Sequence, residues 1–274
     1  MTSLARVGRR IASASAASTG GFISDAAAIA EVEVLKLRRD WTELLTRAVQ
    51  PTLWLLVFGQ VFGRIRAIPT GSVSYLEFLA PGILAQSVLF TAIFYGIAII
   101  WERDLGILQK LLVSPASRGA LVLGKAASAS VRGFSQTIII YVLAAALGVR
   151  LRFDVGALLG VSLAVCLGSA VFSTLSLIVA CLVKTRERFM GIGQVLTMPL
   201  FFASNAIYPL DLMPSWLQAV SRANPLSYLV DAIRGLMIAG SHAAFGLSLD
   251  FVVELSALVL LVVLAARLYP TVAR

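Results

Sequence analysis

Charged residues are scarce in this chain. Asp, Glu, Lys and Arg make up 14% of its 274 residues, whereas soluble domains carry about 25%. Apolar residues account for 59%, and the mean hydropathy is +0.90. A hydrophobic core alone does not require so many apolar side chains, so this composition excludes an ordinary soluble domain. We therefore predict an integral membrane protein.

Residues that support thiol or metal chemistry are also few. The two cysteines, Cys166 and Cys181, lie in one apolar stretch, and His242 is the single histidine. Two cysteines cannot make a disulfide framework, and two thiols alone are a poor metal site. We expect both cysteines to be small buried side chains. We also expect this chain to bind no metal or other cofactor itself.

Basic residues outnumber acidic ones, 23 to 14, which gives a net charge of +9. Such an excess can indicate nucleic-acid binding, but no base-reading motif and no basic–aromatic stripe is present. Most basic residues flank apolar stretches, where they orient a membrane protein. We therefore expect the lipid bilayer, and not nucleic acid, as the partner.

The first 47 residues differ from the rest of the chain. Residues 1–24 are rich in alanine and serine and lack the apolar core of an export signal, so we expect a flexible cytoplasmic tail. Residues 25–47 place Val34, Leu37 and Trp41 on one helical stripe beside charged residues. This pattern predicts an amphipathic helix lying in the membrane interface. Packing against a soluble partner is the alternative.

Apolar stretches fill the remaining domain, residues 48–274. A helix needs about 20 residues to cross the hydrocarbon, so the short first stretch recruits part of the preceding helix. The sequence predicts an all-α fold with six transmembrane helices, at 48–63, 78–100, 133–149, 155–183, 189–208 and 251–268.

The basic residues predict the orientation of these spans. With the N-terminus inside, 17 of the 23 Lys and Arg residues fall in inner segments and six in outer segments. Because inner loops carry the excess of Lys and Arg, both termini are expected in the cytoplasm. Lys125 and Arg132, on the helix entering the third span, are expected to snorkel to lipid head groups.

The stretch GALVLGKAAS, residues 119–128, nearly matches the phosphate-binding motif G-x-x-x-x-G-K-[ST]. Gly119, Gly124 and Lys125 fit the motif, but Ala126 supplies no hydroxyl for a magnesium ion. No β-rich run precedes Gly119, as a phosphate loop requires. We predict that this chain does not hydrolyse ATP.

The stretch belongs to the longest inner connection, residues 101–132. Leu105, Leu108, Leu111 and Leu112 share one face of a helix that Ser114-Pro115 ends. A short cytoplasmic amphipathic helix is suited to docking into a groove on another protein. Lying on lipid head groups is the alternative.

The outer segment 209–250 is long, apolar and punctuated by Pro209, Pro214 and Pro225. Its two helical patterns are too short to span, so we expect short outer helices at about 209–245, lying at the interface or re-entering the membrane. Asp231 and Arg234 are spaced i,i+3 and are expected to pair.

Two further features bear on transport. Glu254 lies near the outer end of the last span, where an acid could mark a proton path. A hydrogen bond to the outer helices is the favoured interpretation. Several phenylalanines could line a route for a lipophilic substrate, or equally face lipid: Phe58, Phe62, Phe90, Phe94, Phe172, Phe201 and Phe202.

Two segments together resemble the ABC-2 type exporter permeases. WERDLGILQKLLVSPASRGALVLGKAASASVRGFSQ is similar to the family pattern of an acidic pair with Gly, Leu-Leu-Val-Ser/Thr-Pro, Ser-Arg and Gly-Lys. NAIYPLDLMPSWLQAVSRANPLSYLVDAIRG is similar to its Tyr-Pro, Met-Pro, Trp-Leu, Asn-Pro-Leu, Tyr and Asp-x-x-Arg pattern. The resemblance runs from about residue 30 to the end, and the daunorubicin-resistance exporters are the nearest subgroup. Asn205-Ala206 departs from the Ser-Gly of many relatives.

The resemblance implies a permease subunit in the plasma membrane, of a bacterium, that exports a drug, lipid or glycolipid. It implies two separate ATPase subunits, which bind ATP and Mg, and a second permease that is the same chain or a paralogue. The implied ATPase-coupling residues are Glu102, Arg103, Asp104, Gly106, Leu108, Leu111, Leu112, Pro115 and Arg118. The implied outer-helix or gate residues are Tyr208, Pro209, Pro214, Trp216, Asn224, Pro225, Tyr228, Asp231 and Arg234. An ion-coupled secondary transporter that uses Glu254 is the alternative function, and a membrane scaffold is a third.

Overall fold

The computed structural model describes residues 49–65, 68–71, 73–104, 118–183 and 185–268. This part of the chain is helical, apart from loops and one isolated antiparallel bridge between Leu151 and Ile238. The predicted all-α class is therefore confirmed for the described residues. The predicted tail (1–24) and interfacial helix (25–47) lie outside them.

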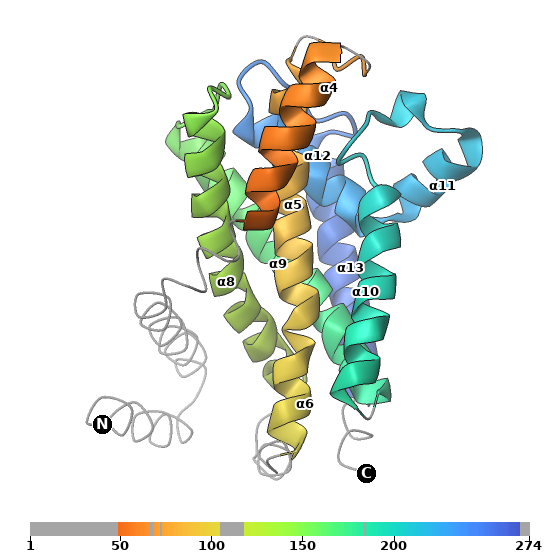
Figure 1. Cartoon of the computed structure of the whole chain (residues 1–274). Coiled ribbons are helices and arrows are strands. Elements are labelled where there is room, and N and C mark those ends of the chain that lie inside the picture. Colours follow the sequence, from red (N-terminus) through yellow and green to blue (C-terminus); the bar gives the residue numbers. More distant parts are fainter. Residues whose placement is uncertain (1–48, 66–67, 72, 105–117, 184, 269–274) are drawn as a thin grey trace.

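The described helices follow one another along the chain and pack side by side (Figure 1). Helical backbone is already present at residue 49 and continues through a π-helical segment. The elements are η1 (Trp54–Gly59), α4 (Gln60–Ile65), α5 (Tyr75–Phe94), α6 (Gly96–Asp104), α8 (Arg118–Ala146), α9 (Val155–Leu182), α10 (Arg186–Phe202), η2 (Leu210–Leu212), α11 (Ser215–Ala223), α12 (Pro225–Met237) and α13 (Leu247–Leu268).

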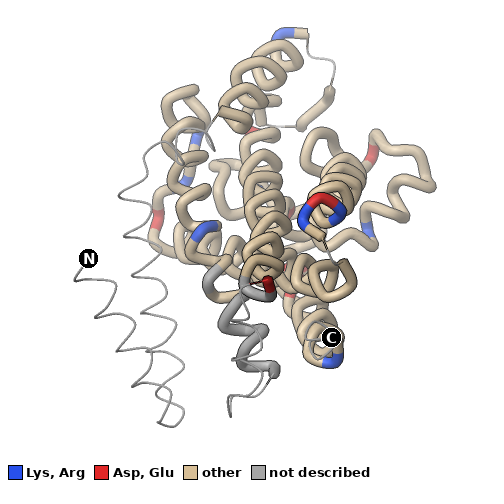
Figure 2. The backbone as a smooth tube through the Cα atoms, turned by 60° about the horizontal axis from the view of Figure 1, so that its bottom comes forward, with Lys and Arg blue, Asp and Glu red and all other residues tan. Residues whose placement is uncertain are grey.

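Four described helical segments are long and apolar enough to cross a membrane: Tyr75–Trp101, Ala129–Ala146, Val155–Leu182 and Leu247–Leu268. They correspond to four of the six predicted spans. The other two predictions fall on the described helical residues 49–65 and on α10, which has 17 residues. Charged residues lie mostly near the ends of the helices, and the long helices are mostly free of them along their middles (Figure 2).

Helix α9 is the centre of the bundle and packs against α5, α8, α12 and α13. Small residues allow these close approaches. A Cβ on Gly133 of α8 would lie 2.9 Å from Val165 of α9, and a Cβ on Gly168 of α9 would meet the side chain of Leu229 of α12. The glycines therefore set the helix spacing in the core.

The outer segment forms two short helices, as predicted, but they differ in burial. Trp216 of α11 is 68% exposed, whereas α12 is buried along almost its whole length against α5, α9 and α13. Asn224 caps α12, and Pro225 occupies its first turn, where the missing N–H costs nothing. Helix α12 is therefore part of the core.

Three hydrogen bonds join the loop after α8 to its neighbours at the end of the bundle that carries α12. The Arg150 Nε donates to Glu77 Oε1 at 2.7 Å. The Arg152 N–H donates to the Met237 carbonyl, and the Ala239 N–H donates to the Arg150 carbonyl, both at 2.9 Å. These bonds flank the Leu151–Ile238 bridge. The loop before α9 is thus fastened to both α5 and α12.

Candidate functional site

At the opposite end of the bundle, an ion pair joins α6 to α10. Arg186 Nη2 lies 2.9 Å from Asp104 Oδ2, and the Arg186 guanidinium lies over the Trp101 ring at 4.0 Å from its centroid. Asp104 ends α6 and Arg186 begins α10, so the two helix ends are held together. Sequence reasoning singled out Asp104 but gave it no partner.

The predicted span 78–100 is interrupted at Tyr95, between α5 and α6. The Ser176 hydroxyl of α9 accepts the Gly96 N–H at 3.0 Å and donates to the Ile93 carbonyl. Gly96 has no space for a side chain, since a Cβ there would overlap the Ser176 hydroxyl and lie 2.5 Å from the Phe189 ring. Ser176 thus satisfies the backbone groups that the interruption frees.

The predicted coupling residues are described only in part. Glu102 and Arg103 lie in the last turn of α6, and Arg118 begins α8, but the side chains of these three residues are outside the described part. The amphipathic helix predicted from Leu105 also falls there and stays a prediction, as do the roles of Gly106, Leu108, Leu111, Leu112 and Pro115.

The near-match to a phosphate loop lies inside a helix. Gly119, Gly124 and Lys125 all belong to α8, which runs without a break from Arg118 to Ala146. A phosphate loop needs an irregular Gly-rich turn between its two glycines, whereas residues 119–125 all have helical backbone in α8. This confirms that the stretch is not a phosphate loop.

Arg234 is the most enclosed cation among the described residues, at 6% exposure. Its guanidinium lies over the Phe78 ring, 3.8 Å from the centroid, and donates to the Asn205 carbonyl at 2.8 Å. The departure from the family pattern at Asn205-Ala206 therefore lies in the turn that binds Arg234.

The predicted Asp231–Arg234 ion pair is wrong. Asp231 Oδ2 instead accepts the Phe245 N–H at 2.8 Å, and no direct ion pair joins it to Arg234. Both side chains leave the same helix but bind the backbone of different loops. The motif Asp-x-x-Arg thus ties α12 to two separate segments, the turn at Asn205 and the loop at Phe245.

The remaining predicted outer residues also make structural contacts. The Asn224 Nδ2 donates to the Leu200 carbonyl at 2.7 Å, which joins α12 to α10. The Tyr228 hydroxyl donates to the Arg222 carbonyl at 2.7 Å. The Tyr208 hydroxyl donates to the Phe202 carbonyl. Pro209 and Pro214 immediately precede η2 and α11.

Glu254 is buried, at 2% exposure, and its carboxylate has no hydrogen-bond partner among the described residues. The predicted hydrogen bond to the outer helices is therefore wrong. Asp250, four residues earlier on the same face of α13, is likewise buried and without a described hydrogen-bond partner. Sequence reasoning missed Asp250, although the i,i+4 spacing of the two acids was visible.

The predicted substrate-path phenylalanines fall into two groups. One is a continuous series of rings that Trp54 joins: it stacks on Phe58 at 4.4 Å and meets Phe201 edge-on at 5.7 Å. Phe62 and Phe202 extend this series at its ends. Phe201 and Phe172 are both 1% exposed, so they belong to the core and line no open route in this structure. The other group is the pair Phe90 and Phe94 on α5.

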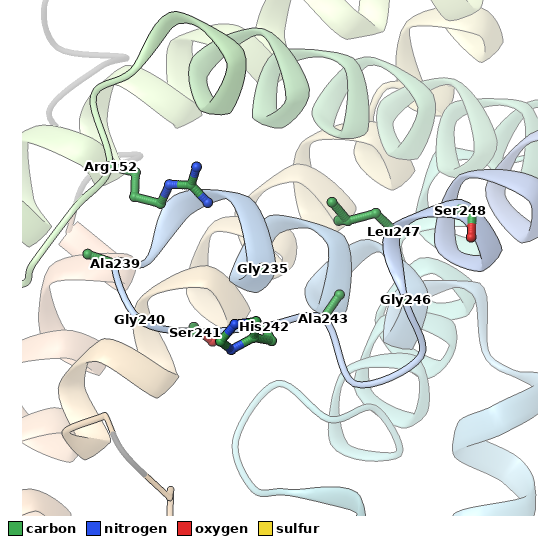
Figure 3. Close-up of a pocket in the computed structure, with 10 residues that line it drawn as sticks. All are labelled: Arg152, Gly235, Ala239, Gly240, Ser241, His242, Ala243, Gly246, Leu247 and Ser248. Carbon is green, nitrogen blue, oxygen red and sulfur yellow. The ribbon is translucent and has the colours of Figure 1, made fainter.

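The end of the bundle that carries α12 is hollowed beside the loop that follows this helix. A shallow pocket of about 720 Å³ lies between Arg152, this loop and the start of α13 (Figure 3). A second pocket, of about 360 Å³, shares Gly240, Ser241 and His242 and reaches Arg234. Among the described residues, no group of His, Cys, Asp and Glu is arranged to hold a metal ion.

The chain matches the ABC-2 type transporter family over residues 26–238. It belongs to this family. It is 32% identical to a protein of Cyanophora paradoxa named as transport permease ycf38, over 82% of this chain and 77% of that one. A Mycobacterium tuberculosis protein, named as the doxorubicin resistance ABC transporter permease DrrC, is 27% identical over 74% and 72%. The daunorubicin resistance permease DrrB1 of Streptomyces coeruleorubidus is 29% identical over 71% and 68%. This ABC-2 family member is thus a membrane transport permease, as the two sequence segments predict.

Proposed function

We propose that this permease is the membrane subunit of an ATP-driven exporter that moves a lipophilic or amphiphilic substrate out of the cell. ATP and Mg bind to separate ATPase subunits. The names of two relatives, which refer to resistance to doxorubicin and daunorubicin, support an amphiphilic drug as one substrate class. A lipid or glycolipid fits the same chemistry, since the spans offer apolar side chains and few charges.

The observation that carries this proposal is the link between α6 and α10. Asp104 and Trp101 precede residues 105–117, and both contact Arg186 at the start of α10. A force on the 101–118 connection therefore acts on two helices at once. An ATPase subunit docked on this connection could shift both helices when it closes on ATP.

The proposed assembly has two ATPase subunits and two permeases, the second being the same chain or a paralogue. The helical residues 49–65 and α10 would serve as the remaining two spans. Both termini would lie in the cytoplasm, and the membrane would be the plasma membrane of a bacterial cell. The excess of Lys and Arg in the inner segments supports this orientation.

The test is ATPase activity of the complex in lipid nanodiscs. We would co-express this chain with a candidate ATPase and compare the wild type with Glu102→Ala and with Leu108→Asp/Leu111→Asp. We expect co-purification of the wild type, and loss of the ATPase from the double variant because charges on the apolar face prevent docking. Purification of this chain alone under all conditions would argue against the proposal.

An ion-coupled secondary transporter is the second candidate, because Glu254 and Asp250 are both buried in α13. Buried acids are the usual sites of ion coupling within membranes. This function predicts uptake or efflux driven by a proton gradient in liposomes without ATP, and its loss in Glu254→Gln. Transport that requires the ATPase and survives Glu254→Gln would exclude it.

A further inference from the structure

The pocket of about 360 Å³ at the α12 end of the bundle is lined by several separate segments of the chain. They are α5 with the segment before it, the turn after α10, η2, α12 and the loop that follows α12. Asp211 and His242 line the pocket and are exposed, whereas Asn205, Asp231 and Arg234 line it and are buried. Buried polar residues therefore form part of its inner wall.

Three polar atoms of this wall have no hydrogen-bond partner among the described residues: Asn205 Oδ1, Asp231 Oδ1 and Arg234 Nε. Neighbouring atoms of the same residues are bound within the protein. Asp231 Oδ2 accepts the Phe245 N–H, and Arg234 Nη2 donates to the backbone carbonyl of Asn205, both at 2.8 Å. Nearly all buried polar atoms in proteins have a partner. Three without one around a single pocket therefore indicate a ligand site.

The charges of the lining favour a cationic ligand. Two carboxylates, Asp211 and Asp231, face one guanidinium, that of Arg234, so the net charge is −1 with His242 neutral. Among the described residues, no group of His, Cys, Asp and Glu is arranged to hold a metal ion. The oxygens of Asn205 and Asp231 instead match N–H donors, which an organic ammonium supplies.

We propose that this pocket binds an amino-alcohol group, with its protonated nitrogen between the side chains of Asn205 and Asp231. The nitrogen carries at least two N–H groups, one for each unpaired oxygen, and its charge matches the Asp231 carboxylate. The nearby oxygen of the ligand accepts from Arg234 Nε. The Arg234 guanidinium is fixed for this contact, since it lies over the Phe78 ring and binds the Asn205 carbonyl.

Two sources could supply this chemistry. One is the ethanolamine head group of a bilayer lipid, in which a phosphate oxygen lies close to a primary ammonium. The other is a free amino alcohol that reaches the pocket from the surrounding solution. Binding does not depend on the proposed export function, and the permease without ATPase subunits is sufficient to measure it.

The test is isothermal titration calorimetry with the purified full chain in dodecyl maltoside. The probe is protonated N-hexylethanolamine, which has two N–H donors and a hydroxyl. The matched probe, N-hexyl-N,N-dimethylethanolammonium, has the same charge and hydroxyl but no N–H. We expect saturable binding of the first probe and about tenfold or more weaker binding of the second, which cannot donate to the carboxylate.

Variants assign the binding to this pocket. Asp231→Asn should weaken binding of N-hexylethanolamine about tenfold or more, because it removes the charge while keeping an oxygen for the Phe245 N–H. Asn205→Leu should weaken it severalfold and leaves the backbone carbonyl that binds Arg234 in place. The matched control is Glu187→Gln, an exposed acid in the first turn of α10, which should bind as the wild type does.

Competition distinguishes the two sources of the ammonium. Displacement of the probe by dioleoyl phosphatidylethanolamine, but not by dioleoyl phosphatidylcholine, identifies a bilayer lipid, and no displacement by either identifies a free amino alcohol. Displacement by both lipids, equal binding of the two probes, absence of saturable binding or unchanged binding in Asp231→Asn overturns the proposal. Should Asp231→Asn fail to fold, Asn205→Leu decides, and wild-type binding in that variant overturns the proposal as well.

Discussion

Gly96 donates its N–H to the Ser176 hydroxyl at 3.0 Å and so joins the break between α5 and α6 to the last third of α9. The same hydroxyl donates to the Ile93 carbonyl on the other side of the break. One buried side chain thus serves as partner for two backbone groups that a continuous helix would have paired internally. The break is stable because α9 supplies what α5 has lost.

Ser176→Ala should destabilise the protein by about 1–3 kcal/mol, because it leaves a buried N–H and a buried carbonyl without this partner. The measurement is the thermal unfolding temperature in detergent, read by intrinsic fluorescence. Ser256→Ala is the matched control, since this hydroxyl binds a carbonyl of its own helix on an exposed face. A smaller loss in Ser176→Ala than in Ser256→Ala would contradict the assigned role.

Gly82→Ala should prevent normal folding. A Cβ at Gly82 of α5 would overlap the carbonyl oxygen of Ala206 and lie 2.9 Å from the carbonyl carbon. Both atoms are backbone, so they cannot rotate away, and overpacking of this kind costs about 1–3 kcal/mol or more. Size-exclusion profiles of fluorescent fusions give the yield of folded protein. Gly191→Ala, at a position with open space, should leave that yield unchanged.

Arg186→Asp should reduce substrate-stimulated ATPase activity of the complex while changing stability little. The side chains of Arg186 and Asp104 are 37% and 42% exposed, and exposed pairs contribute only about 0.2–1 kcal/mol. The double variant Asp104→Arg/Arg186→Asp should recover part of the activity, since it restores opposite charges. If the double variant is no better than the single one, the pair does not connect the two helices functionally.

Arg234→Lys should destabilise the protein although it retains the positive charge. The guanidinium both stacks on Phe78 and donates to the Asn205 carbonyl, whereas an ammonium cannot reproduce the planar contact. Loss of a buried bond from a charged donor removes about 1.5–3 kcal/mol. Chemical or thermal unfolding of the purified permease measures it. Arg222→Lys, on the exposed side of α11, is the control that should unfold as the wild type does.

The sequence predicted those elements whose signal is local. An apolar stretch at 155–183 corresponds to α9 at Val155–Leu182, and the prolines at 214 and 225 correctly mark the starts of α11 and α12. Each depends on neighbouring residues, because helix length, caps and turns are properties of short segments. The near-match to a phosphate loop was also interpreted from its own and neighbouring residues, and these residues are helical in α8.

Features that depend on distant partners were not predicted. The break at Tyr95 requires Ser176, 80 residues away from Gly96 in the chain. Arg234 was paired with Asp231 because they share a helix face, yet its partners lie on α5 and in the turn before η2. The burial of Glu254 and Asp250 depends on how α13 packs against the bundle. No periodicity in one segment carries such information.

The bonds around the Leu151–Ile238 bridge have a mechanical consequence. Two backbone hydrogen bonds and the Glu77–Arg150 pair fasten α5, the loop after α8 and the end of α12 at one end of the bundle. At the opposite end, α6 and α10 share the exposed Asp104–Arg186 ion pair with the Trp101 ring beside it, and the buried Phe189 of α10 packs in one apolar cluster with Ile99 and Ile100 of α6. The two ends of the bundle are therefore fastened by different means: hydrogen bonds to backbone and side chains at the α12 end, and apolar packing beside one exposed ion pair where α6 and α10 meet.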